Sequence, residues 1–200
     1  LTDTNHDGVI NGADIGVTLN LTSGTDLQAQ LTEVVGLAGQ LHSAGIDYIG
    51  IDGAAAANLS ITDAQAATLV GAGLAFSAGD NITLNAPVSG VGTHLSTSLQ
   101  DLQKLGVDTV AIAGASATVD LGTLGSGVLH GDLSGGSLPT FTALTDTNGD
   151  GVVDGADIGV TLNLHSGADL QAQLTEVVGL AGQLHSAGID DIGIDGAAAA

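Results

Sequence analysis

Cysteine, tryptophan and methionine are absent from the 200 residues, and the aromatic side chains are one tyrosine and two phenylalanines. The lack of cysteine excludes a disulfide-bonded scaffold and a zinc site built on thiolates. Hydrophobic residues still make up 44% of the chain, so leucine, isoleucine, valine and alanine must fill its core. Such side chains favour thin, regular layers over one bulky core. The 32 glycines, about twice the usual share, indicate many tight turns.

Basic residues are also almost missing. Lys104 stands against 22 acidic residues, which gives a net charge of −21. Such a chain cannot neutralise nucleic-acid phosphates, and an anionic membrane would repel it. No apolar run reaches the roughly 18 residues that a membrane-spanning helix needs. We therefore expect neither nucleic-acid binding nor membrane insertion. Either the carboxylates bind divalent cations, or the acidity only keeps the chain soluble.

A long internal repeat dominates the sequence. Residues 1–57 recur at 144–200, where 51 of the 57 positions are identical. We interpret 1–143 as one full repeat period and 144–200 as the start of the next. The opening Leu1-Thr2-Asp3 has neither a methionine nor a basic region, so we expect no signal peptide and a section of a longer protein. The six differences are His6/Gly149, Ile10/Val153, Asn11/Asp154, Thr22/His165, Thr25/Ala168 and Tyr48/Asp191.

A shorter unit of roughly 30 residues recurs within the period, over about residues 23–113. Each unit has a helical stretch, a glycine stop and an alternating apolar run. We expect Asp26 or Ser23 to cap the first helix, and Thr62 with Gln65 to form a capping box for the second. Gly45 and Gly106 suit left-handed helix stops. Helical spacing is shown by Leu27, Leu31, Val34, Ala38 and Leu41, and again by Leu95, Leu99, Leu102 and Leu105.

Strands are predicted where apolar residues alternate with polar ones, at Tyr48–Asp52, Asn81–Ala86 and Asp108–Ala113. Strand–helix–strand order favours parallel pairing with helices on one face. The predicted fold class is therefore α/β, with repeating strand–helix units in a solenoid-like array of parallel strands. A closed globule for each period is the alternative. Residues 114–143, rich in glycine, serine and threonine, are predicted to form the junction between periods, as a loop or as short strands such as Ala117–Leu121.

One motif carries metal chemistry. Residues 3–14 have the spacing of an EF-hand calcium loop, with Gly8 at the position of the sharp turn. Hard oxygen ligands at this density select calcium over softer metals. Ile10 is expected to point its apolar side chain inward. The alternative is a turn-rich loop without metal. The predicted ligands are Asp3, Asn5, Asp7, the Val9 carbonyl, Asn11 and Asp14.

The second copy of the loop, residues 146–157, preserves this chemistry. The Asn11/Asp154 difference exchanges one oxygen ligand for another, and the Ile10/Val153 difference keeps an apolar residue. The segment after the loop is ambiguous, because an EF-hand continues as a helix whereas Ile15, Val17 and Leu19 alternate like a strand. The predicted ligands are Asp146, Asn148, Asp150, the Val152 carbonyl, Asp154 and Asp157.

Aspartate in place of the usual glutamate at the last loop position, followed by Ile15 or Ile158, resembles the calcium loops of dockerin domains. The resemblance covers about 12 to 20 residues in each copy. Dockerins place two loops close together to bind a cohesin partner, but here the loops are 143 residues apart. The resemblance therefore implies calcium binding but not cohesin binding. The shorter aspartate would weaken affinity, which suits extracellular calcium.

No nucleophile elbow, phosphate loop or dinucleotide fingerprint occurs, and each copy has one glutamate, Glu33 or Glu176, so we expect no enzyme. The composition and tandem organisation resemble those of giant secreted surface proteins and adhesins of bacteria. This resemblance implies an extracellular, calcium-binding structural repeat that acts as a stiff stalk or spacer. The alternatives are a subunit of a self-assembling filament and a dockerin-like accessory region of a secreted carbohydrate-active enzyme. The expected partners are calcium and neighbouring repeats of the same or identical chains.

Overall fold

The computed structural model describes residues 16–53, 58–86, 93–122, 137–166 and 170–195. These segments contain strands, four α-helices and one short 3-10 turn. The strands are β1 (Val17–Thr22), β2 (Ile46–Asp52), β3 (Asn58–Thr62), β4 (Ala75–Phe76), β5 (Asn81–Ala86), β6 (Thr93–His94), β7 (Thr109–Ile112), β8 (Ser116–Asp120), β9 (Thr140–Ala143), β10 (Gly159–His165) and β11 (Asp191–Asp195). The helices are α1 (Leu27–Ser43), α2 (Asp63–Ala72), α3 (Leu99–Leu105), α4 (Leu170–Ser186) and the 3-10 turn η2 (Gly155–Asp157).

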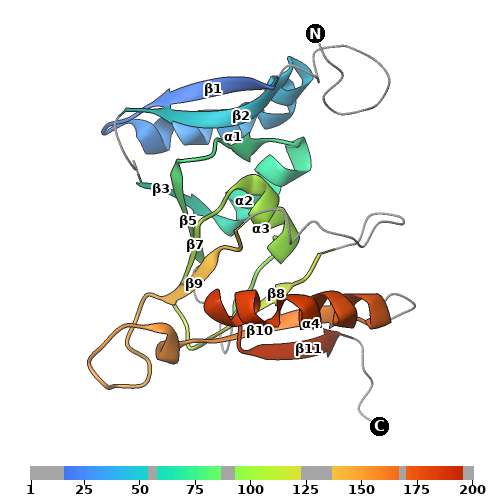
Figure 1. The fold of residues 1–200 in the computed structure, drawn as a ribbon. Coiled ribbons are helices and arrows are strands. Elements are labelled where there is room, and N and C mark those ends of the chain that lie inside the picture. Colours follow the sequence, from blue (N-terminus) through green and yellow to red (C-terminus); the bar gives the residue numbers. More distant parts are fainter. Residues whose placement is uncertain (1–15, 54–57, 87–92, 123–136, 167–169, 196–200) are drawn as a thin grey trace.

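The strands form three sheets, with the orders β1-β2-β4, β3-β5-β7-β9 and β11-β10-β8-β6. Every strand pairing is parallel, which confirms the α/β class with parallel strands. Figure 1 shows β1, β2 and α1 at one end of the molecule and β10, β11 and α4 at the other, with β3, β5, β7 and β9 between them.

The middle sheet adds its strands in chain order. Leu59 pairs with Ile82, Leu84 with Val110, and Val110 with Phe141, so neighbouring strands stand 23, 26 and 31 residues apart. Between β3 and β5 the chain forms α2 and also visits another sheet through β4. The unit length predicted from the sequence therefore corresponds to one added strand of this sheet.

The helix ends follow local chemistry for the most part. Thr62 and Gln65 form the predicted capping box at the start of α2, and Gly106 ends α3 with a left-handed φ of 83°. Asp26 stands at the N-cap of α1, as one of the two predicted alternatives had it, but its side chain makes no capping hydrogen bond. Instead, the Gln30 side chain reaches back, accepting a bond from Thr22 N and donating one to Thr22 O.

The predicted strands are present, although some bounds differ. The strand at Asn81–Ala86 is confirmed as β5, and the ambiguous segment after the calcium loop is a strand in both copies, β1 and β10. Leu95 was expected on the third helix but precedes it, since α3 begins at Leu99; it is nevertheless buried. The segment 114–143 is more than a loop, because it contains both β8 and β9.

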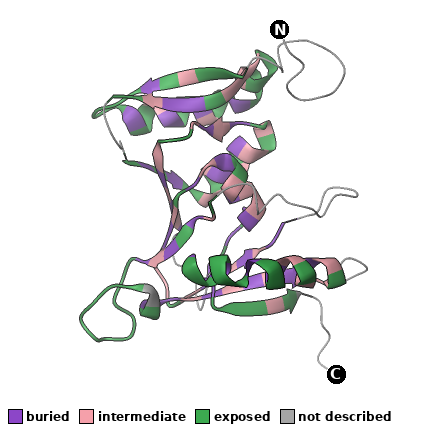
Figure 2. Cartoon of the chain, in the orientation of Figure 1, coloured by how far each residue is buried: buried purple, intermediate pink, exposed green. Residues whose placement is uncertain are grey.

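The core lies between the sheets and the helix faces turned toward them (Figure 2). It is built from leucine, isoleucine, valine and alanine together with the two phenylalanines, Phe76 and Phe141. Alternation along β5 and β8 places every second side chain in this core. None of the helices in the described segments has the length and hydrophobicity that a membrane crossing requires.

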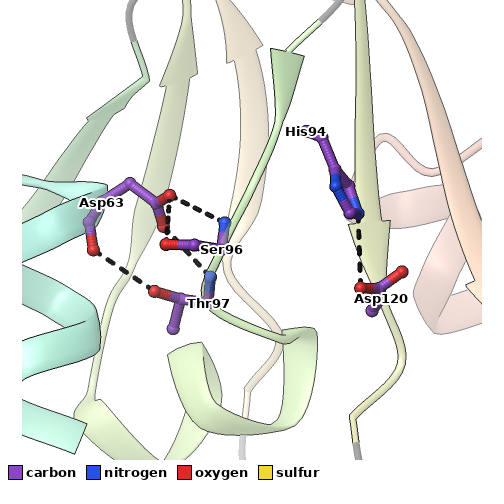
Figure 3. A network of polar contacts seen from close by, with 5 residues as sticks. All are labelled: Asp63, His94, Ser96, Thr97 and Asp120. Carbon is purple, nitrogen blue, oxygen red and sulfur yellow. Dashed lines mark hydrogen bonds and ion pairs between the residues drawn. The ribbon is translucent and has the colours of Figure 1, made fainter.

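Polar side chains join successive units (Figure 3). Asp63, the first residue of α2, accepts hydrogen bonds from Ser96 N at 2.7 Å and from Thr97 N at 3.2 Å. Both donors lie just before α3, and Thr97 is buried. His94 Nε2 lies 3.3 Å from Asp120 Oδ2 and joins β6 to β8. The bonds to Asp63 thus fix the start of α2 against the segment that leads into α3.

Candidate calcium loop

The second predicted loop connects β9 of the middle sheet to β10 of a neighbouring sheet. It projects from the body of the molecule in Figure 1. From Leu144 to Asp154 its residues are exposed, whereas Asp157 and Ile158 are buried where the chain re-enters the fold. The first loop lies outside the described residues, and with it the predicted ligands Asp3, Asn5, Asp7, Val9, Asn11 and Asp14.

Three predicted ligands are held by amide groups of the loop itself. Asp146 accepts from Gly149 N at 2.6 Å with Oδ1 and from Gly151 N at 2.8 Å with Oδ2. Asn148 Oδ1 accepts from Asp150 N at 2.9 Å, and Asp150 Oδ1 accepts from Val152 N at 2.8 Å. Each of these oxygens keeps a second lone pair. The hydrogen bonds therefore orient the side chains without exhausting their capacity as acceptors.

The backbone turns where the motif predicts a turn. Gly151, at the sixth loop position, has φ of 88°, in the left-handed region that favours glycine. After the turn, the loop departs from an EF-hand. A 3-10 turn at Gly155–Asp157 and then β10 replace the long exiting helix.

Asp157 closes the loop. Its Oδ1 accepts from Thr147 N at 2.7 Å and from Asn148 N at 3.0 Å, and its Oδ2 accepts from Asp154 N at 2.9 Å. The Thr147 hydroxyl also donates to the Asp157 backbone oxygen. These bonds, first that from the Asp154 amide, lower the pKa of the buried Asp157 carboxyl. Asp157 thus joins the start of the loop to its end, a role that the motif did not predict.

This arrangement predicts a loss of stability in acid that depends on Asp157. Its pKa is lower in the folded chain than the value of about 4 in an unfolded one. The ionised carboxylate therefore stabilises the fold above about pH 4, and this contribution disappears as pH falls through the lowered pKa. Asp157→Asn lowers the urea midpoint at pH 6, because the amide cannot accept from both ends of the loop.

Urea unfolding of both proteins between about pH 6 and pH 2 measures the effect, since other carboxylates contribute equally to each. The difference in urea midpoint between wild type and Asp157→Asn should become smaller as the pH falls. A gap that stays constant across this range would contradict the assignment of the acid loss to Asp157.

The donor set suits a hard cation but does not form a ready-made cluster. Asp146, Asn148, Asp150 and Asp154 offer only oxygen ligands, and Asp157 keeps free capacity at Oδ2, which accepts a single bond. Within the described part of the chain, however, no three carboxylate or imidazole groups are placed to hold one metal ion. The predicted ligands Val152 and Asp154 are both exposed, with Asp154 Oδ1 accepting from Ala156 N at 2.8 Å.

The apolar residue of the loop is not where the motif placed it. Val153 was expected to point inward, but it is 51% exposed, and Val152 is 56% exposed. The inward expectation is therefore wrong for Val153. Sequence reasoning also missed Thr147, whose only signal is its recurrence as Thr4 in the first copy.

Two histidines at equivalent places in the two copies each lie close to an aspartate. His42 Nδ1 lies 3.6 Å from Asp47, and in the second copy His185 Nδ1 lies 3.6 Å from Asp190. Each pair joins the last helical turn to the start of the following strand. Comparison of the chain with models of protein families, with curated proteins and with solved structures gave no match.

Proposed function

We propose that this chain is a structural, calcium-binding repeat segment of a long extracellular bacterial surface protein, in which it acts as a stiff spacer or stalk. The observation that carries the proposal is the loop between β9 and β10. There, Asp146, Asn148 and Asp150 are oriented by loop amides at the point where one repeat period meets the next. The dockerin-like spacing of the loop, present twice, and the net charge of −21 support it.

Calcium would neutralise the carboxylates of this loop when bound. Asp146, Asn148, Asp150, the Val152 carbonyl and Asp154 would hold it. Asp157 would keep the two ends of the loop together and reach the ion through Oδ2, because two amide groups already occupy Oδ1. Binding coupled to loop ordering adds to stability by mass action.

The arrangement of the array that we propose is solenoid-like. The middle sheet gains one parallel strand per unit, in the order β3-β5-β7-β9, and the chain passes through a neighbouring sheet between additions. Repeated addition of such units yields an elongated body in which each unit contacts its neighbours. Calcium loops at the period junctions would then stiffen an extended chain.

The test is a thermal melt of the 200-residue protein with millimolar calcium and with chelator, while light scattering follows its size. Calcium at 100 times its Kd would stabilise the chain by about 2.7 kcal/mol per site, which raises Tm by roughly 5–10 °C. An unchanged Tm would contradict calcium binding. Growth into long particles on addition of calcium would instead favour the filament alternative.

Matched variants separate loop binding from general charge neutralisation. Asp7→Asn with Asp150→Asn removes one carboxylate from each loop, while the amide oxygen at position 150 can still accept from Val152 N. The control, Asp26→Asn with Asp191→Asn, makes the same change in net charge at exposed positions outside the loops. The first pair should reduce the calcium response and the control should preserve it. Equal responses would mean that calcium acts on overall charge alone.

A further inference from the structure

One module stands in two different surroundings within this chain. Residues 16–52 and 159–195 differ only at Thr22/His165, Thr25/Ala168 and Tyr48/Asp191. In both, a strand and a 17-residue helix lead into a second strand. Differences in burial between equivalent residues therefore come from what lies beside each copy. They identify the surfaces that are covered in one copy and exposed in the other.

The first difference lies at the strand edge. In the second copy, β10 is paired on one side with β11 and on the other with β8, through bonds from Gly159 N to Ala115 O and from Leu121 N to Asn163 O. In the first copy, β1 pairs with β2 alone among the described strands. Val160 is fully buried in β10, whereas its equivalent in β1, Val17, is 42% exposed.

The second difference lies on the helix. On α4 a stripe formed by Gln173, Val177, Leu180 and Leu184 is buried. On α1 the equivalent of Leu180, Leu37, is 45% exposed. The end of the helix differs in the same way. Phe141 N of β9 donates to Ala187 O at 2.8 Å and Ala187 is buried, whereas its equivalent in the first copy, Ala44, is exposed.

The opposite faces show the complementary pattern. In the first copy, Leu31 and Ile49 are fully buried on the side of α2 and β4. In the second copy, Leu174 is partly exposed and Ile192 is 46% exposed. Figure 2 shows α4 and β11 largely exposed on the side in view. Among the described residues, the first copy is thus covered on the side that follows it in the chain and open on the side that precedes it, and the second copy shows the reverse.

We propose that the edge of β1 that pairs with none of the described strands, together with the outer face of α1, is a docking surface for the β8- and β9-type strands of a preceding repeat in the same chain. The proposal rests on the tandem arrangement of the proposed function. The occupant is set by the second copy, where these two strands cover the same module. A separate molecule of this chain is not the occupant, because both edges of its β8 are already paired, with β6 and β10.

In the proposed docking, β1 gains a parallel neighbouring strand and apolar side chains beside it become buried. Alternate residues of a parallel strand bond to the same neighbour, so Thr18 and Asn20 would take the places that Thr161 and Asn163 hold opposite Thr118 and Asp120. Burial of Val17, Leu37 and Ala44 under the incoming strands supplies apolar area, as it does for their equivalents in the second copy.

The experiment compares the 200-residue protein with an extended chain that carries an additional copy of residues 1–143 ahead of Leu1. Hydrogen exchange of the Thr18 and Asn20 amides should slow by at least about tenfold, toward the rates of Thr161 and Asn163. Val119→Pro in the added copy removes an amide on the side of β8 that faces β10, so it should restore fast exchange at Thr18 and Asn20. As a control, Val119→Pro in the original copy should leave these two amides protected and expose Thr161 instead. Unchanged exchange at Thr18 and Asn20 in the extended chain would overturn the proposal.

A second measurement does not depend on exchange. Leu37→Ala should lower the Tm of the 200-residue protein only slightly. In the extended chain, Leu37→Ala should lower Tm by as much as Leu180→Ala does. An equally small drop in both chains would also overturn the docking. Because both measurements are made with and without calcium, docking without any calcium response would leave this inference standing while the calcium proposal fails.

Discussion

Alanine at Gly188 is expected to destabilise the protein by about 2–5 kcal/mol, whereas alanine at the equivalent Gly45 should cost about 1–2 kcal/mol. Both glycines end a helix of the same sequence, with φ of 87° at Gly188 and 86° at Gly45. The penalty for a side chain in the left-handed region is therefore the same in both copies. What differs is the space beside each glycine.

A Cβ at Gly188 would lie 3.1 Å from the backbone oxygen of Phe141, while nothing lies within 4 Å of one at Gly45. The carbonyl belongs to β9, and the pairing of β9 with β7 keeps it from rotating away. Urea unfolding of the two single variants measures the difference directly. Equal free-energy losses would show that the contact between α4 and β9 is looser than the structure has it.

Leu102→Ala is expected to destabilise the protein by about 2–5 kcal/mol. Leu102 lies on α3, is fully buried and belongs to the main core. Its truncation removes apolar contacts and leaves a cavity, because the strands on either side are fixed by their ladders. The midpoint in urea should fall while the slope of the transition stays constant, since the exposed area on unfolding changes little.

Leu37→Ala is the matched control, because it makes the same truncation on a helix of the same fold. Leu37 is 45% exposed on α1, so the expected loss is about 1 kcal/mol or less. Similar losses for the two variants would mean that α3 is not held in the core as described.

Elements with a complete local signal were predictable from the sequence. The alternation of Asn81–Ala86 and the capping box of Thr62 with Gln65 need only neighbouring residues, and both are present. Strands β4 and β6, two residues each, carry no such signal, because pairing with distant strands creates them. Leu95 was misplaced on a helix because burial before α3 gives it the same apolar spacing as burial within it.

The candidate site divides in the same way. The left-handed turn at Gly151 follows from the residue itself, and the oriented oxygens of Asp146 and Asp150 follow from short-range turns. The exposure of Val153 and the closure of the loop through Asp157 were not predictable. Both depend on the folded arrangement of the loop, in which Val153 is exposed and the amides of Thr147 and Asn148 donate to Asp157.

The near-identity of the two modules has a consequence for folding in a chain with a further copy. Strand β8 is followed after 38 intervening residues by β10, and a copy one period later would offer the same strand after 181. The difference in loop-closure entropy favours the nearer strand by about 1.4 kcal/mol, roughly tenfold. If strand pairing alone came to equilibrium, β8 would therefore prefer the nearer strand only weakly over the equivalent strand one period later. If the array folds from one end, each new module pairs with β8 before the next copy is available. This order of folding would suppress pairing with the wrong copy.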